Sequence, residues 1–78
     1  MDTKMKGWLS IIGVNIRCRR NNLNYSQEYM GYKLNISQNA YSKIELNQTK
    51  LTVQRLYEIA VIFEITPIEL MGFLVVES

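Results

Sequence analysis

The sequence predicts an all-α domain built from five short helices. Apolar residues recur at spacings of three and four, and no stretch alternates apolar with polar residues as a half-buried strand would. One proline and four glycines supply little of the turn chemistry that the hairpins of a sheet need. With 78 residues, 47% of them apolar and 21% charged, the chain has the composition of one small globular domain. We expect the helices at about 10–22, 26–33, 37–46, 52–63 and 66–72.

Four apolar stripes define the expected core, one for each of the first four helices. The stripes are Ile12, Ile16 and Leu23; Met30 and Leu34; Tyr41 and Ile44; and Leu56, Ile59, Ala60 and Phe63. Residues 10–72 therefore form the expected domain. Residues 1–9 are interpreted as an N-terminal extension, and residues 73–78 as an apolar C-terminal tail.

Side chains that can cap a helix stand at the expected starts. Ser26, Ser37, Thr52 and Thr66 each come just before an apolar-periodic segment, where a side-chain oxygen can accept a hydrogen bond from a free backbone N–H. The last start is the strongest, because Pro67 occupies the first helical position and Glu69 can complete a capping box with Thr66.

Asparagines stand where glycine usually ends a helix. Asn24, Asn35 and Asn47 follow the first three expected helices, and asparagine is the best non-glycine residue for the left-handed conformation of that position. Replacing any of the three by glycine is expected to be neutral or to stabilise the domain by up to roughly 1 kcal/mol.

The composition excludes several chemistries. The chain has no histidine and a single cysteine, Cys18, which rules out an intrachain disulfide, a Cys/His zinc site and histidine-based catalysis. The carboxylates are scattered and no glycine-rich phosphate loop occurs, so we expect no enzyme, no metal, no cofactor and no small-molecule ligand. No apolar run reaches the length of about 18 residues that a membrane span needs.

Charge is distributed unevenly along the chain. Residues 1–55 hold all nine lysines and arginines and three acids, a net charge of +6, whereas residues 56–78 hold four glutamates and no base. A basic segment of this kind is typical of a protein with a polyanionic partner, although an uneven solvated surface would look the same.

The two short helices expected at 26–33 and 37–46 are joined by a turn around Asn35. Two short helices with a turn of three or four residues form a helix-turn-helix, whose second helix can enter the major groove of DNA. A generic helical hairpin would show the same pattern.

A family resemblance favours the first of these interpretations. It rests on the segments Ile12-Gly13-x-x-Ile16-Arg17, Arg20, Ser26-Gln27-Glu28, Leu34-Asn35-Ile36-Ser37-Gln38, Tyr41-Ser42-Lys43-Ile44-Glu45 and Leu56-x-x-Ile59-Ala60. Over about residues 11–71, the chain resembles the phage-repressor-like (XRE-type, lambda-repressor-like) helix-turn-helix family.

The resemblance implies a compact five-helix domain of a cytoplasmic bacterial or phage-encoded protein, a transcriptional regulator that binds double-stranded DNA as a homodimer on a palindromic operator. It assigns base reading to Gln38, Asn39, Ser42 and Lys43. Contact with phosphate is assigned to Gln27, Asn47, Thr49 and Lys50, and we add Ser37 and Arg17. The resemblance also implies an ion pair between Arg20 and Glu45.

Two residues depart from the family pattern. Gly31 replaces the alanine that packs the second helix against the third, and it should loosen the second helix by about 0.5–1 kcal/mol relative to alanine. Arg19 occupies a position that is usually apolar.

The third expected helix has a chemistry of its own that suits DNA. Its outer side carries Gln38, Asn39, Ser42 and Lys43 and no carboxylate. The two amides can bond adenine bidentately, and the ammonium suits guanine or phosphate. Taken alone, Gln38 and Asn39 could be ordinary polar surface, and Ser42 and Lys43 could contact either bases or phosphates.

The apolar C-terminal end predicts a dimer contact, because so small a domain cannot easily cover it. The residues expected there are Leu70, Phe73, Leu74, Val75 and Val76. A tail that folds back on its own domain is the alternative. A protein-interaction module on the same scaffold, of the antitoxin or anti-repressor type, is the alternative to a DNA-binding regulator.

Overall fold

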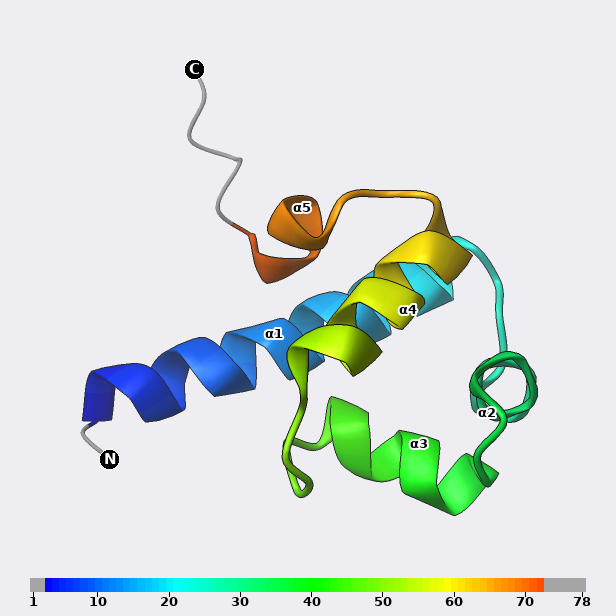
Figure 1. Ribbon diagram of the computed structural model, residues 1–78, viewed down its shortest axis with the longest axis horizontal. Coiled ribbons are helices and arrows are strands. Elements are labelled where there is room, and N and C mark those ends of the chain that lie inside the picture. Colours follow the sequence, from blue (N-terminus) through cyan, green and yellow to red (C-terminus); the bar gives the residue numbers. More distant parts are fainter. Residues whose placement is uncertain (1–2, 73–78) are drawn as a thin grey trace.

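Five α-helices follow one another along the chain, which confirms the expected all-α fold (Figure 1). The computed structural model describes the backbone of residues 3–72 and the side chains of residues 11–72. The helices are α1 (Thr3–Asn22), α2 (Gln27–Leu34), α3 (Gln38–Glu45), α4 (Val53–Phe63) and α5 (Pro67–Met71).

Helix α1 begins at Thr3, so the expected start near residue 10 is wrong. Serine is a residue type that can cap a helix, but the helical backbone runs through Ser10 without a break. The backbone of residues 3–9, which the sequence analysis treated as an extension, is therefore part of the first helix.

The other four helix starts are as expected. The side-chain oxygens of Ser26, Ser37, Thr52 and Thr66 accept from the backbone N–H groups of Tyr29, Ala40, Arg55 and Glu69 at 2.9, 3.0, 3.1 and 3.1 Å. The capping box of α5 is complete, because the Thr66 N–H donates to Glu69 Oε1 at 3.0 Å.

The helix ends reveal one residue that the sequence analysis missed. Asn24, Asn35 and Asn47 adopt the expected left-handed conformation, with φ of 60°, 61° and 60°. Glu64 ends α4 in the same conformation, with φ of 61°. A glutamate carries no stop signal, and it has neither the small side chain of asparagine nor the freedom of glycine to offset the steric cost.

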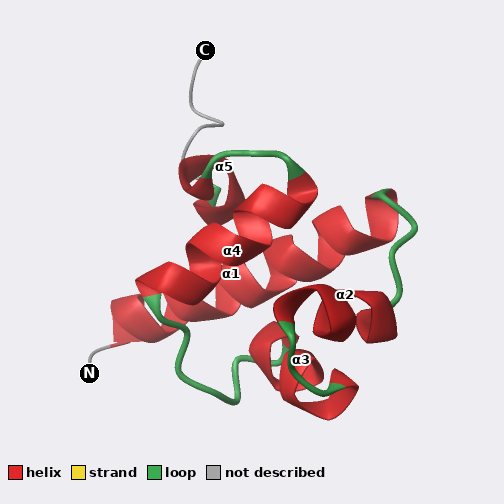
Figure 2. Cartoon of the chain, turned by 45° about the vertical axis from the view of Figure 1, so that its right-hand side comes forward, coloured by secondary structure: helices red, strands yellow, loops and turns green. Residues whose placement is uncertain are grey.

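The core collects one stripe from each of the first four helices, and α5 closes it. The buried apolar residues are Ile16, Met30, Leu34, Tyr41, Ile44, Leu56, Ile59, Ala60, Phe63 and Leu70, with Ile12 packed against them. Leu23 was expected in the first stripe, but it follows the end of α1 and is 38% exposed. Figure 2 shows α2 and α3 joined by a short loop below α1 and α4.

Two glycines let helices approach more closely than any side chain would allow. A Cβ at Gly31 would lie 2.9 Å from the carbonyl oxygen of Ile36, in the turn between α2 and α3. A Cβ at Gly13 would lie 2.6 Å from the carbonyl oxygen of Glu45, so α1 rests on the C-terminal end of α3. The expectation that Gly31 only weakens α2 relative to alanine is therefore wrong, because an alanine would push the turn away.

Replacing Glu64 by glycine should stabilise the domain. A non-glycine residue in the left-handed conformation costs roughly 1–2 kcal/mol, and part of this gain is offset by the freedom that glycine adds to the unfolded chain. We expect a gain of about 1 kcal/mol and a rise in Tm of about 4–8 °C. Thermal unfolding of Glu64→Gly beside Asn35→Gly tests this, and the asparagine variant should show the smaller change. A lower Tm for Glu64→Gly would contradict it.

Candidate nucleic-acid interface

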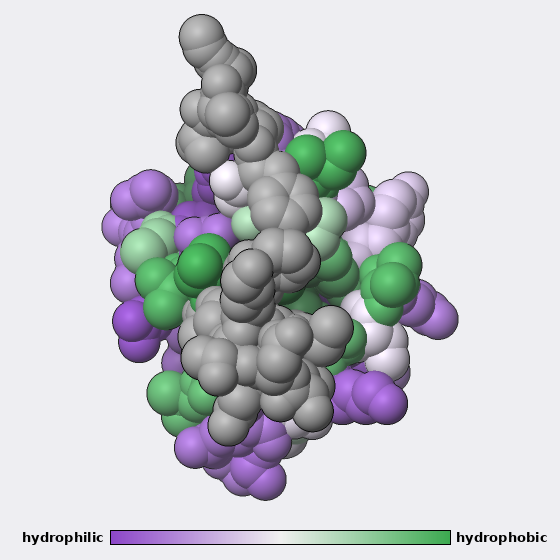
Figure 3. All heavy atoms as spheres, turned by 90° about the vertical axis from the view of Figure 1, so that its left-hand side faces the viewer, coloured by the Kyte–Doolittle hydropathy of each residue, from purple (hydrophilic) through white to green (hydrophobic). Residues whose placement is uncertain are grey.

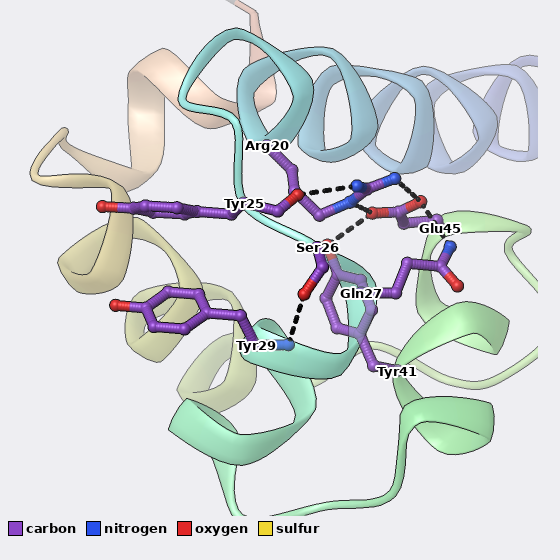
Figure 4. A network of polar contacts seen from close by, with 7 residues as sticks. All are labelled: Arg20, Tyr25, Ser26, Gln27, Tyr29, Tyr41 and Glu45. Carbon is purple, nitrogen blue, oxygen red and sulfur yellow. Dashed lines mark hydrogen bonds and ion pairs between the residues drawn. The ribbon is translucent and has the colours of Figure 1, made fainter.

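A buried carboxylate joins the first three helices (Figure 4). Arg20 on α1 forms a bidentate pair with Glu45 on α3, in which Nε donates to Oε2 at 2.6 Å and Nη2 donates to Oε1 at 3.2 Å. The Tyr41 hydroxyl donates to Oε2 at 2.5 Å, and Gln27 Nε2 on α2 donates to Oε1 at 3.1 Å. The third guanidinium nitrogen of Arg20 donates to the carbonyl of Tyr25 at 2.9 Å. The expected pair is thus part of a larger network.

The network fixes the charge state of its members. Burial raises the pKa of the Glu45 carboxyl, but the hydrogen bonds from Arg20, Tyr41 and Gln27 outweigh burial and hold that pKa below its ordinary value. The bond to Glu45 raises the pKa of Arg20. Burial, and then the bond to Glu45, raises the pKa of Tyr41. Glu45 is therefore a carboxylate with four donors, held by a charged arginine and a neutral tyrosine.

This arrangement orients α3. The Glu45 side chain is 1% exposed and that of Arg20 is 11% exposed, so the pair is shielded from water and from salt. Tyr41 and Ile44 are buried on the same helix. Three hydrogen bonds to Glu45 from α1 and α2, together with buried Tyr41 and Ile44, therefore fix the inward side of α3. Gln38, Asn39 and Lys43 are exposed on the rest of the helix.

The outward side of α3 carries the residues expected to read bases. Gln38, Asn39 and Lys43 are exposed, and Ser42 is half-buried. Gln38, Asn39 and Ser42 line an open depression together with Gln27 from α2. The structure thus brings three of the four residues to one hollow at the start of α3, and Lys43 lies outside its lining.

Gln27 has a structural role that the sequence analysis missed. It stands at the first position of α2, directly after the cap Ser26. Its side-chain amide nitrogen donates to Glu45, so that group is already engaged within the protein. The Tyr29 N–H is taken by the Ser26 cap, whereas the backbone N–H groups of Gln27 and Glu28 have no partner inside the helix and can bind an anion.

The loop after α3 forms a separate group on another side of that helix. Thr49 and Lys50 are exposed and line a second depression, whose other lining residues are Ile36, Ala40, Ile44, Thr52 and Arg55. Asn47 is exposed and shapes the loop through its left-handed backbone. Ser37 is exposed as the cap of α3, and Arg17 is exposed on α1 outside the linings of both depressions.

Arg55 is a further basic residue beside this loop that the sequence analysis did not single out. Its guanidinium donates to the carbonyl of Leu34, the last residue of α2, at 3.3 Å and to Glu58 at 2.9 Å. Its position in the first turn of α4, three residues after the Thr52 cap, was the available signal, because the first turn of a helix rarely favours a cation. Arg55 ties the end of α2 to α4.

The residues expected at a dimer contact divide into two groups. Leu70 is 1% exposed and belongs to the core, where its carbonyl accepts from Asn15 Nδ2 at 3.1 Å. It is therefore not available to a second copy, and this part of the expectation is wrong: α5 turns Leu70 inward to close the core. Phe73, Leu74, Val75 and Val76 lie outside the described residues.

The fold and the interface define a helix-turn-helix DNA-binding domain. A family model described as Helix-turn-helix (HTH_3) matches residues 16–70, and the chain belongs to this XRE-type, lambda-repressor-like family. No curated protein and no solved structure matches the chain. Within residues 3–72, every helix is too short or too polar to span a bilayer.

Replacing Glu45 by alanine should unfold or strongly destabilise the domain. The variant leaves the guanidinium of Arg20 and the hydroxyl of Tyr41 without their acceptor, and removing one partner of a buried pair costs about 3–5 kcal/mol. Urea unfolding measures the loss. Glu58→Ala is the matched control, because it removes the exposed pair with Arg55 and should cost at most about 1 kcal/mol. Equal stability of the two variants would refute the structural role of Glu45.

Stability should also fall in acid through Glu45. Above the ordinary pKa of glutamate, 4.5, the carboxyl is ionised in both the folded and the unfolded chain, and its contribution is complete. As the pH falls below that value, the carboxyl takes up a proton in the unfolded chain before it does so in the folded chain. The free energy of unfolding therefore falls until the pH drops below the lowered pKa of Glu45 in the folded protein. Unfolding free energies between pH 7 and 3 should show this decline in the native protein, and a flatter profile in Glu45→Gln.

Proposed function

We propose that the chain is a sequence-specific transcriptional regulator, acting as a repressor, that binds a palindromic operator as a homodimer. The observation that carries the proposal is the outward side of α3, where exposed amides gather without a carboxylate. Such a surface fits the major groove, whose base edges offer donors and acceptors and whose phosphates repel acids.

Base readout is assigned to the hollow at the start of α3. The exposed amides of Gln38 and Asn39 can each pair with the donor and acceptor of an adenine edge. Ser42 can bond to any base edge, since its hydroxyl both donates and accepts. Lys43 lies outside the hollow and is assigned to guanine or to a flanking phosphate.

Phosphate contacts are assigned to two places that flank α3. On one side, the backbone N–H groups of Gln27 and Glu28 at the start of α2 suit an anion. The phosphate contact of Gln27 is therefore assigned to its backbone, since its side chain is bonded to Glu45. On the other side, the exposed side chains of Asn47, Thr49 and Lys50 follow α3. Ser37 and Arg17 complete the proposed set.

A homodimer follows from the small size of one reading surface. One copy of α3 offers four candidate side chains and covers only a few base pairs. Two copies related by a two-fold axis would place α3 in successive major grooves about 34 Å apart and so read a palindrome. Bound across a promoter, such a dimer would exclude other proteins, which supports repression.

Selection of bound duplexes from a random pool at fixed salt tests the proposal. We expect a palindromic consensus with two half-sites about one helical turn apart. If the folded protein shows no preference among duplexes even in dilute buffer, the proposal fails. A protein-interaction module of the antitoxin or anti-repressor type would then explain the scaffold, a role for which exposed Tyr32 and Val53 give support.

Two substitutions should separate base reading from phosphate binding. Gln38→Ala should weaken binding to the selected operator by about 1–3 kcal/mol per half-site and relax the base preference at one position of each half-site. Lys50→Ala should weaken binding to all duplexes alike. It should also reduce the slope of log affinity against log salt concentration by about one for each copy of the chain. Gln54→Ala removes an exposed amide on α4 that bonds to Glu58, and it should change neither property. Titrations at several salt concentrations distinguish these outcomes.

A further inference from the structure

Helix α4 exposes a row of apolar side chains that nothing in the proposed DNA contact uses. Val53, Tyr57 and Val61 stand four residues apart and are 84%, 59% and 56% exposed. The buried residues of the same helix, among them Ile59 and Phe63, face the core. Spacing by four places the three residues along one side of α4, and we call them the α4 stripe.

The α4 stripe continues into a groove between α2 and α4. The groove is lined by Lys33, Leu34, Tyr57, Glu58, Val61 and Ile62. Its charges are one ammonium and one carboxylate, so it is neutral as a whole. Figure 3 views the molecule from the left-hand side of Figure 1, and apolar side chains are exposed among polar ones on both sides of that view.

We propose that the α4 stripe is the surface on which a second copy of the chain docks, with the two α4 helices antiparallel across a two-fold axis at Tyr57. The order of the three residues, valine–tyrosine–valine at a spacing of four, is the same in both directions along the helix. An antiparallel pair therefore places Val53 against Val61 of the partner subunit and the two Tyr57 side chains against each other.

The chemistry of the stripe fits a copy of itself better than another partner. Across a two-fold axis each residue near the axis meets its own counterpart, so a charged surface would repel itself. The stripe carries no charge, and the groove beside it holds one charge of each sign. Apolar, weakly charged surfaces are also what distinguishes interfaces between identical subunits.

The docking leaves the DNA-contacting residues free. None of the base-reading or phosphate-binding residues assigned above belongs to the stripe or to the lining of its groove. This inference rests on the homodimer of the proposed function, but it concerns a surface that binds without DNA. The two can therefore fail separately.

Chemical cross-linking without DNA tests the position of the axis. In a Cys18→Ser background, Tyr57→Cys should give covalent dimers with a short bismaleimide, because only residues at the axis meet their own copy. Ile68→Cys is the matched control, since Ile68 on α5 is also 56% exposed, and it should remain monomeric on a denaturing gel. Dimers through Ile68→Cys but not Tyr57→Cys would overturn the inference and assign the contact to α5 and the tail.

Sedimentation without DNA tests the energetics. Val53→Glu should raise the dimer dissociation constant roughly tenfold or more, because the acid would face an apolar partner residue. An acid at the first position of α4 favours the helix, so folding is preserved. Ile68→Glu places an acid in the first turn of α5 and should leave the dimer intact.

A native chain that sediments as a monomer at about 100 μM, or a Val53→Glu variant that dimerises normally, would overturn the inference. If the native chain forms the Tyr57-centred dimer but selects no duplex, the docking surface stands and the DNA-binding regulator does not.

Discussion

The carboxylate of Glu45 is the constraint on which the other features of this domain depend. Four donors from three elements meet on its two oxygens, and together with burial they determine how α2 and α3 lie against α1. Two-turn helices such as α2 and α3 are not stable alone, so their orientation has to come from contacts of this kind. A buried charge without its partners is costly, which makes the arrangement both strong and specific. The outward direction of Gln38, Asn39 and Lys43 is a consequence.

The parts of the fold that depend on local chemistry could be predicted from the sequence. Serine and threonine caps, asparagine at the left-handed ends and the apolar spacing of α2 to α4 each act within a few residues, so the pattern carries the information. The parts that depend on contacts between distant residues could not be predicted. Gly31 looked like a weakness in α2 until its distance from the Ile36 carbonyl was known. Leu70 looked like a free apolar residue until α5 was seen to turn it into the core.

The candidate site shows the same division. The exposed positions of Gln38 and Asn39 follow from their place at the start of a helix whose other side is apolar. The engagement of the Gln27 side chain with Glu45, eighteen residues away, has no local signal. Glu64 also has no local signal, because its left-handed backbone ends α4 although glutamate is not a residue type that favours this conformation. The sequence predicts which residues of α3 are exposed better than it predicts what holds the helix in place.

Gly13 shows that the orientation of α3 also depends on an atom that is absent. The missing Cβ at this position sets how closely α1 and α3 approach, since the backbone of Glu45 occupies the space that a methyl group would fill. Any larger residue at position 13 would have to push α3 away from α1, and the exposed amides of Gln38 and Asn39 would move with the helix. A substitution in the middle of α1 can therefore alter the geometry of a distant surface without touching any residue on it.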